Sequence, residues 1–520
     1  MLGEYSLNKE SKGKKNIINE EEEEEKKKEE ENNESIFSKD HEINLSLITD
    51  KEKNNKQLFI SIFNPIDNLN IYLNEKSYLF NSSNLEFLSI IRVIFLFLCI
   101  YNYQFYIITK YHPTIISKHS FYDFKFFMIK LSSYAININY ILDGFIFVYK
   151  FMNYYKNEIN NNTKYIIFKF FLLCIPKIIL FMINFFIFHS LFPGILDYIG
   201  LKTDINDEFY LSYFKNFECE KEIPKIFIPI YYEYKNYSNI SKCYSFVFIY
   251  KNEFFSFVLS LILFSIIFKI QSHIFDFFIS IIIILNLLIS PLIFITSPKI
   301  YEKNTILGNI SYLTTPNVFF SCYMIGGFFG LIYFYYLDVI SSDRDPFLYK
   351  PFIFIDYIAK KLDMLSYNVK VCFSLILIFI LFLISTNYNI LRYFLGGENI
   401  SFEMNFIAKI IYHYEIIFVI FIFLLILINL LLIEKLRISF PVFTFIERIN
   451  STIFSNLDSF IQISLCYFDF QFYLNYHDLF FISLGQYFLI IILSGFINIL
   501  FELPFKILIK KIIRNKKEEI

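Results

Sequence analysis

Among the few ionisable residues in or beside the long apolar stretches of this chain, five are the first candidates for chemistry. They are Arg92, Asp143, Lys177, Glu253 and Asp276. A charge near the centre of a membrane-spanning helix costs roughly 2.5 to 3.5 kcal/mol, so each needs a buried partner or a ligand. Arg92 could orient the first span by pairing with a carboxylate, or it could bind an anionic group, and the sequence favours neither role over the other. For Asp143 and Glu253, a role as the buried partner of a basic residue is favoured over a role as catalytic acid or base.

Histidine supplies one further candidate. His477 lies next to an apolar stretch, where it could act as a general base, although a lone histidine at that place also fits a structural role. Five other histidines show no metal-ligand spacing: His112, His119, His189, His273 and His413. The chain has no zinc, phosphate-loop or dinucleotide-binding signature. The sequence therefore predicts no metal and no bound cofactor.

The composition is that of a membrane protein. Of the 520 residues, 55% are hydrophobic, and they are gathered into runs about as long as a bilayer is thick. Phe and Tyr are so abundant that a single aromatic position carries little information. The formal net charge is -1, and no basic groove or recognition motif is present, so no nucleic-acid partner is predicted.

The apolar runs predict the architecture. A hydrocarbon core of about 30 Å requires about 20 apolar residues per helix, and ten runs meet this rule. They are residues 88–108, 133–152, 166–192, 254–270, 275–296, 317–337, 369–387, 413–433, 455–474 and 480–501. The ninth run is the weakest because it contains Asn456, Asp458 and Gln462, and it could instead lie along the interface. The sequence therefore predicts an all-α, polytopic transmembrane helix bundle of about ten spans.

The remaining segments divide the chain into three parts. Residues 1–80 carry blocks of Glu and Lys and cannot bury enough apolar surface to fold alone, so we expect a disordered cytoplasmic tail. Residues 81–505 form the predicted membrane domain, with a long polar loop at 193–244. Residues 506–520 form a basic cytoplasmic tail. The first apolar run lies too far along the chain for a cleavable signal peptide, so the first span is expected to target the protein.

Basic residues predict the orientation through the positive-inside rule. Ten spans with a cytoplasmic start return the basic C-terminus to the cytoplasm. The basic segments 338–363 and 434–448 also fall inside, and the loop 193–244 falls outside. We therefore expect an integral, multi-pass protein of the endoplasmic reticulum or plasma membrane, with both termini in the cytoplasm.

The outside loop carries two signs of a lumenal environment. Asn236 and Asn239 begin acceptor sequons for N-glycosylation. Cys219 and Cys243 lie in the same loop, where an oxidising lumen favours a disulfide between them over two free thiols. Several other sequons fall inside, and the cysteine pair is therefore the better indication.

A series of short motifs follows the spans in order. They are LEFLSIIRVIFLFL with Arg92, YILDGFIFVYKF with Asp143 and Gly144, KYIIFKFFLLCIP with Pro176, YKNEFFSF with Asn252 and Glu253, YMIGGFFG with Gly326 and Gly330, FYLNYH with His477, and FELPF at residues 501–505. In this order the series resembles a divergent member of acyltransferase family 3. These are multispanning membrane O-acyltransferases, and the resemblance is to their nose-resistant-to-fluoxetine branch.

The resemblance implies a function and a site. The protein would transfer an acyl group from acyl-CoA or a similar donor to a hydroxyl of a lipid or glycan, with membrane lipid as a partner. Arg92 would hold a phosphate or carboxylate of the donor, Glu253 would orient a partner group, and His477 would be the base. Asn252, Asp143 and Tyr103 would line the substrate site. Asp143 stands where the family usually has Ser.

One departure from the family keeps an alternative function open. The family places a His about eleven residues after its first-span Arg, and here that position is Tyr103. An unperturbed Tyr titrates near 10 and is no base at neutral pH. The alternative is a catalytically inactive relative that binds or transports a lipid or small amphiphile. An ion-coupled carrier ranks below both because the chain lacks internal repeats.

Two motifs also carry structural expectations. Gly326 and Gly330 have the small-xxx-small spacing of a close helix contact. In FELPF, Glu502 and Pro504 are expected to end the last helix at the membrane interface.

Overall fold

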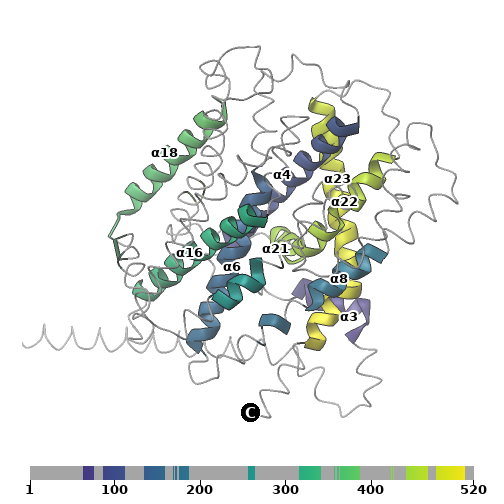
Figure 1. The fold of residues 1–520 in the computed structure, drawn as a ribbon, viewed down its shortest axis with the longest axis horizontal. Coiled ribbons are helices and arrows are strands. Elements are labelled where there is room, and N and C mark those ends of the chain that lie inside the picture. The colour runs from purple at the N-terminus through teal and green to yellow at the C-terminus, as the bar shows by residue number, and fades with distance from the viewer. Residues whose placement is uncertain are drawn as a thin grey trace, which may run out of the picture. The chain divides into compact units, whose positions relative to one another are not determined.

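The computed structural model describes part of the chain in two units, Met1–Asn74 and Glu75–Ile520. The described residues are 62–74, 86–111, 134–157, 168, 170–172, 175–186, 254, 256–263, 316–340, 357, 360–361, 364–386, 423, 426, 441–466 and 476–509. Within them the secondary structure is helical and contains no strand, so the all-α prediction is confirmed for this part of the chain (Figure 1).

The described helices have the following bounds. They are α3 (Pro65–Asn74), α4 (Glu86–Tyr111), α6 (Ala135–Asn157), α8 (Ile175–Phe186), α16 (Pro316–Ile340), α18 (Tyr367–Thr386), α21 (Pro441–Arg448), α22 (Asn450–Cys466), α23 (Tyr476–Ile497) and the π-helical turn η4 (Asn498–Glu502). Helices α4, α6, α16, α18 and α23 each lie within a few residues of a predicted span. The run 275–296 lies outside the described residues, and 413–433 is described only at two positions.

One described helix, Leu479–Ile509, is long and apolar enough to cross a bilayer. Shorter apolar helices occupy Leu88–Gln104, Phe170–Leu180, Cys322–Leu337 and Tyr367–Ile380. At 1.5 Å per residue, a 31-residue helix is about 46 Å long, which exceeds a hydrocarbon core of about 30 Å.

Helix α3 departs from the sequence prediction, which placed residues 1–80 in a tail without structure. The side chain of Asn64 accepts the backbone N–H of Ile66 at 3.2 Å and donates to Asp67 at 2.8 Å. Pro65 supplies the fixed φ of a first helical position. Capping by Asn64 thus offsets the cost of starting a short helix in a polar segment.

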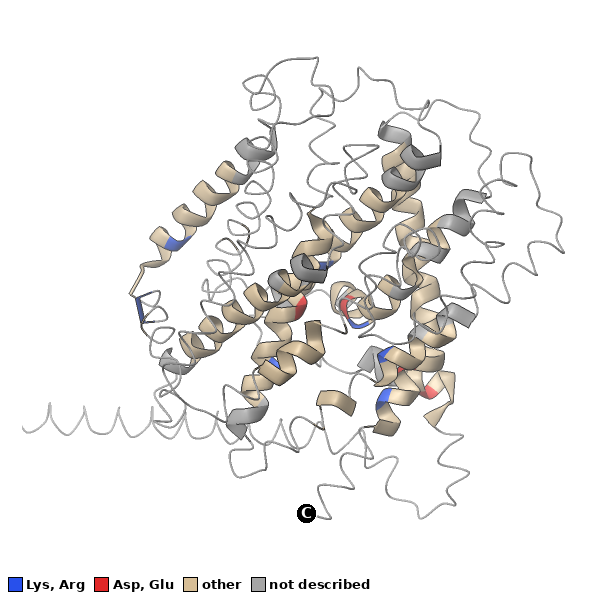
Figure 2. Cartoon of the chain, viewed as in Figure 1, with Lys and Arg blue, Asp and Glu red and all other residues tan. Residues whose placement is uncertain are grey.

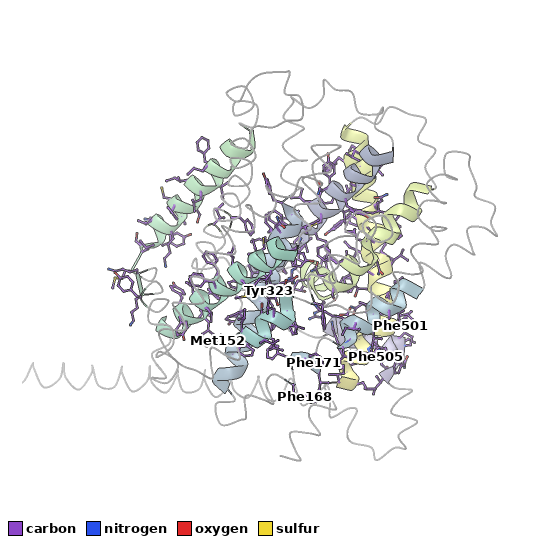
Figure 3. The ribbon with its side chains drawn as sticks, viewed as in Figure 1. Met152, Phe168, Phe171, Tyr323, Phe501 and Phe505 are labelled. Atoms are coloured by element: carbon purple, nitrogen blue, oxygen red, sulfur yellow. The ribbon has the colours of Figure 1, made fainter. Side chains whose placement is uncertain are left out.

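Helices α6 and α16 pack backbone to backbone through glycine. A Cβ at Gly144 would overlap the carbonyl oxygen of Tyr323, and a Cβ at Gly326 would overlap that of Ile141. A Cβ at Gly330 would lie 2.7 Å from the carbonyl oxygen of Phe145. The predicted small-xxx-small contact is therefore confirmed, and Tyr323 marks the crossing in Figure 3.

Helix α4 lies between α6, α21 and α23. It runs antiparallel to α23, because Gln104 accepts a hydrogen bond from Ser483 at 2.5 Å while Tyr487 donates to the Val93 carbonyl at 3.3 Å. Phe97 packs edge-on against Phe480, with ring centroids 5.5 Å apart. Aromatic side chains therefore fill much of the interface between the first and last predicted spans.

Helix α22 packs antiparallel to α23 through polar side chains. Asn456 donates to Ser494 at 3.3 Å, and Asn498 donates to Thr452 at 2.8 Å. These contacts give the ninth predicted span polar partners within the bundle. Asn456 and Thr452 thus contribute to a polar interhelical seam, and the side chains of Asp458 and Gln462 lie outside the described residues.

The end of the chain corrects one prediction. Pro504 does not end the last helix, which continues through it to Ile509. Before the proline the helix widens into η4, where the Leu503 N–H donates to the carbonyl of Asn498, five residues back. A π-helical turn shifts the hydrogen-bond register by one residue. The shift relieves the usual conflict between a proline ring and the preceding turn.

Helix α18 is buried along one narrow stripe. Lys370, Ser374 and Leu377 are buried, and Lys370 donates to the Tyr336 hydroxyl at 3.3 Å. Most other described side chains of α18 are large, apolar and exposed: Tyr367, Val369, Phe373, Leu375, Ile376, Ile378 and Phe379. The Lys370 contact places the start of α18 beside the end of α16.

Candidate functional site

Arg92 lies in the second turn of α4 and joins three helices. Its Nη1 donates to Glu447 Oε1 on α21 at 3.1 Å, and its Nη2 pairs with Asp143 Oδ1 on α6. The side chains of Arg92 and Glu447 are 7% and 1% exposed, and that of Asp143 is 25% exposed. We call these three residues the Arg92 triad.

The triad depends on contacts between distant parts of the chain. Arg92 lies 51 residues from Asp143 and 355 residues from Glu447. Asp143 immediately precedes Gly144, the residue that seats α6 against α16, so its carboxylate is held on a fixed backbone. A guanidinium presents its N–H donors in a planar fork that suits two carboxylates. The triad therefore fastens α21 and α6 to the first turns of α4.

Lys150 adds a second positive charge to the triad. It lies seven residues after Asp143 on α6 and interacts electrostatically with Glu447 and Arg92, and more weakly with Lys177 and Lys506. Arg448, the residue after Glu447, also interacts electrostatically with Glu447. Figure 2 shows that charged positions are sparse in the described helices, and several lie where α4, α6 and α21 meet.

Glu447 lies on α21, between the eighth and ninth predicted spans. Burial raises the pKa of Glu447, and the positive charges of Arg92 and Lys150 oppose that rise. Its ionised form is thus supported by basic neighbours in place of water. Removal of either neighbour would favour the neutral acid.

A second buried carboxylate lies at the end of the last helix. Glu502 accepts from Ser451 at 3.0 Å and from Thr452 at 2.5 Å, and Lys506 lies 2.6 Å from the same carboxylate. Asn498 also donates to it at 2.5 Å. Four donors satisfy a side chain that is 0% exposed. Glu502 therefore ties η4 to the start of α22, next to Phe501 and Phe505 in Figure 3.

Tyr103 does not join the Arg92 triad. It is buried on the same helix, but eleven residues separate it from Arg92, which corresponds to about 16 Å along the helix axis. The neighbouring Gln104 contacts Ser483 on α23. The structure thus separates two predicted site residues, with charge around Arg92 and neutral polar groups around Tyr103.

Of the other predicted site residues, His477 is described by its backbone alone. His477 lies in the first turn of α23, whose start is at the same end of the bundle as Tyr103, and its side chain is outside the described residues. Asn252 and Glu253, the pair Cys219 and Cys243, and Asp276 also lie outside the described residues.

The segment that follows Glu253 is described and packs inside the bundle. Phe257 lies edge-on to Phe147 of α6, with centroids 5.0 Å apart, and Ser260 contacts the sulfur of Met324 on α16 at 3.3 Å. Residues 256–263 therefore pack against α6 and α16.

Sequence reasoning did identify Asp143 as a partner for a basic residue, and its pairing with Arg92 confirms that part of the prediction, although its side chain is only partly buried. It missed Glu447. The sequence predicts that residues 434–448 form a basic cytoplasmic loop, in which Glu447 and Arg448 would form a solvated ion pair. The available signal was the apolar sequence PVFTFIER, which begins with a proline suited to a helix start.

The described residues contain no group of three or more His, Cys, Asp or Glu side chains arranged to hold a metal ion. Comparison of the chain with protein-family models, curated proteins and solved structures finds no match.

Proposed function

We propose that this chain is a multispanning membrane protein of about ten spans. The exposed faces of α18 and α23 support this proposal. On α23 the exposed large side chains are Phe481, Phe488, Leu489, Ile492, Leu493 and Phe496, and η4 adds Leu500. Contiguous apolar surface of this kind is uncommon on a soluble monomer, whereas lipid tails would solvate it at no cost.

The directions of the helices also support ten alternating spans. Alternation requires α4 and α22 to run one way and α6, α16 and α23 to run the other. Pairs of contacts make α6 antiparallel to α4. Helix α6 runs parallel to α16, because the contacts advance together from Ile141–Gly326 to Tyr149–Phe334. Pairs of contacts also make α23 antiparallel to both α4 and α22. Each of these relations agrees with the predicted order of spans.

The proposed activity is transfer of an acyl group from a donor such as acyl-CoA to a hydroxyl of a lipid or glycan. The observation that carries it is the buried guanidinium of Arg92, held by carboxylates near the predicted cytoplasmic end of the first span. It would bind a phosphate or carboxylate of the donor. His477 would take the hydroxyl proton as the acceptor oxygen bonds to the acyl carbon and the thiolate leaves with the thioester sulfur.

The test is an assay of purified protein in lipid nanodiscs. Radiolabelled palmitoyl-coenzyme A would be supplied with lipid and sugar alcohols, and we expect labelled ester and free thiol in equal amounts. His477→Ala should lower kcat, whereas Gly485→Ala on an open face of the same helix should not. Absence of ester with every acceptor, together with an intact cellular phenotype in His477→Ala, would remove the catalytic proposal.

A second candidate is a relative that binds or transports an amphiphile without turnover. Tyr103 favours this candidate for two reasons. A tyrosine is no base at neutral pH, and Tyr103 lies about 16 Å along the helix axis from Arg92, where the donor's anionic group would bind. Saturable, Arg92-dependent binding of palmitoyl-coenzyme A without ester formation would favour it. Robust turnover would exclude it.

A further inference from the structure

Lys150 lies near the end of α6, in surroundings that are mostly positive. It is attracted to the carboxylate of Glu447 and repelled by Arg92, Lys177 and Lys506, so three cations face its ammonium against one carboxylate. The ammonium forms no hydrogen bond or ion pair with the described residues, and its side chain is only partly buried. The described part of the protein therefore leaves Lys150 short of negative charge.

The described carboxylates near Lys150 are engaged elsewhere. Glu447 accepts a hydrogen bond from Arg92 at 3.1 Å and also interacts with Arg448. Glu502 lies 2.6 Å from Lys506 and also accepts from hydroxyl groups of α22. An anion from outside the protein would therefore supply what these carboxylates do not.

Three lysines occupy helix ends that share one side of the predicted membrane. Lys150 lies near the end of α6, Lys177 in the first turn of α8 and Lys506 near the end of the last helix. We call them the lysine cluster. Helix α8 packs against η4, and in the proposed order of spans all three ends face the cytoplasm. Because Lys150 lies near the end of the predicted span 133–152, the cluster lies at the depth of the lipid headgroups.

Exposed aromatic side chains accompany the lysine cluster. Phe151, the residue after Lys150, packs against Phe170 with ring centroids 5.3 Å apart. Beside Phe170, Phe168 and Phe171 are 37% and 47% exposed, and both are labelled in Figure 3. Basic and apolar surface therefore occur together, which is the combination that a lipid headgroup and its acyl chains require.

We propose that the lysine cluster binds the headgroup of an anionic phospholipid of the cytoplasmic leaflet, through a phosphate monoester such as that of phosphatidic acid. A phosphate monoester presents several acceptor oxygens and close to two negative charges, and each lysine ammonium donates several hydrogen bonds. Basic pockets between helices on the cytoplasmic side bind lipid headgroups in this way. The proposal rests on the proposed membrane location and is independent of acyl transfer.

The test measures binding of phosphatidic acid and phosphatidylserine to the full chain in detergent micelles by native mass spectrometry. We expect saturable binding that is tighter for phosphatidic acid. Lys150→Gln should weaken it by about tenfold or more, as for loss of a charged hydrogen bond, whereas Lys150→Arg should retain most of the affinity. Lys361→Gln makes the same change at an exposed position of the predicted cytoplasmic segment 338–363 and should leave affinity unchanged.

A second measurement separates lipid binding from a structural ion pair. In phosphatidylcholine nanodiscs, Lys150→Gln should unfold close to the wild-type temperature, because repulsion from three cations offsets the attraction to Glu447. Added phosphatidic acid should raise the unfolding temperature of the wild type and leave that of Lys150→Gln unchanged, since a ligand of the folded state stabilises it. A clear loss of stability in Lys150→Gln without phosphatidic acid would show that Lys150 serves Glu447, and would overturn the proposal.

Three binding results would also overturn it. Equal affinity for both lipids would indicate diffuse attraction to surface charge. Binding that Lys150→Gln leaves unchanged would place the lipid elsewhere on the protein. Displacement of the lipid by inorganic phosphate or coenzyme A would assign the lysine cluster to a soluble phosphate compound. Ester formation in the nanodisc assay tests acyl transfer separately, so either proposal can fail while the other stands.

Discussion

At the scale of single residues, the described buried charges form networks in which one central side chain contacts several partners. Arg92 faces two carboxylates, whereas Glu502 faces four donors. In each network the central residue serves several neighbours. Loss of the central residue should therefore cost more than loss of one neighbour, since a buried charge left without a partner is the expensive outcome.

Replacement of Arg92 tests this asymmetry. Arg92→Gln leaves Asp143 and Glu447 beside each other without the guanidinium, and we expect it to lower the free energy of unfolding by about 3 to 5 kcal/mol. Glu447→Gln leaves Arg92 paired with Asp143 and should cost about 1 to 2 kcal/mol. Reversible unfolding in mixed micelles measures both values. Equal losses would contradict the network described for Arg92.

Replacement of Glu502 tests the second network. Glu502→Gln places an amide donor among groups that all donate, and we expect a loss of about 2 to 3 kcal/mol. Lys506→Met should cost less because the Lys506 side chain is 33% exposed, and exposed ion pairs contribute little. Thermal unfolding of the two variants under the same conditions provides the comparison. A larger loss for Lys506→Met would show that the ion pair dominates.

At the scale of elements, the contact between α6 and α16 places Asp143 within the triad. Glycine on both helices allows the backbones to touch, and this contact fixes the height and rotation of α6. The other interfaces use larger side chains, such as the aromatic rings between α4 and α23. A change at the glycine contact should therefore propagate to the triad.

Glycine substitutions test the role of this contact. Gly144→Ala and Gly326→Ala each force a Cβ into a backbone carbonyl, so we expect a loss of about 3 kcal/mol or more, or no folded protein. Gly330→Ala should be milder, since its Cβ would lie 2.7 Å from Phe145. Gly485 has nothing within 4 Å of an added Cβ, and Gly485→Ala should be neutral or slightly stabilising. Monodisperse yield and thermal unfolding report the result.

At the scale of the whole molecule, the described contacts separate two kinds of polar group along the bundle. Ion pairs join Arg92, Asp143, Glu447, Glu502 and Lys506, and in the proposed topology these lie toward the cytoplasmic end. Neutral amides near the other end of α4 include Asn102 and Gln104.

Topology mapping tests the proposed orientation. Tags at both termini should be digested by protease added to the cytoplasmic side of sealed vesicles, and the protein should stay in the membrane after alkaline carbonate extraction. Glycan addition at Asn236 or Asn239, lost in Asn→Gln variants, would place the loop in the lumen. Protection of one terminus but not the other would indicate an odd number of spans and contradict the proposal.

Much of the helical framework was predictable from the sequence. Long apolar runs predicted α4, α6, α16, α18 and α23 to within a few residues, because a continuous apolar run of this length has few other ways to satisfy its backbone. Their ends were less predictable. The capped helix α3, and the continuation of the last helix through Pro504, depend on single side chains and on one shifted hydrogen bond.

The candidate site was predictable only in part. An arginine in an apolar run requires a counter-charge, and Asp143 was foreseen as one on that ground. Glu447 was not, since its burial arises only when α21 packs against α4, and no spacing in the sequence encodes a contact across 355 residues.

The sequence by itself determined that the described part of this chain is helical, that its last helix is long and apolar enough to cross a bilayer, and that Arg92 must have a partner. Hydrophobic length and the cost of a buried charge suffice for those conclusions. Only the tertiary structure decided that Arg92 has two carboxylate partners, that one comes from the short helix α21, and that Tyr103 lies too far away to share the site. Such facts depend on which helix faces pack together, and packing is a property of the assembled bundle.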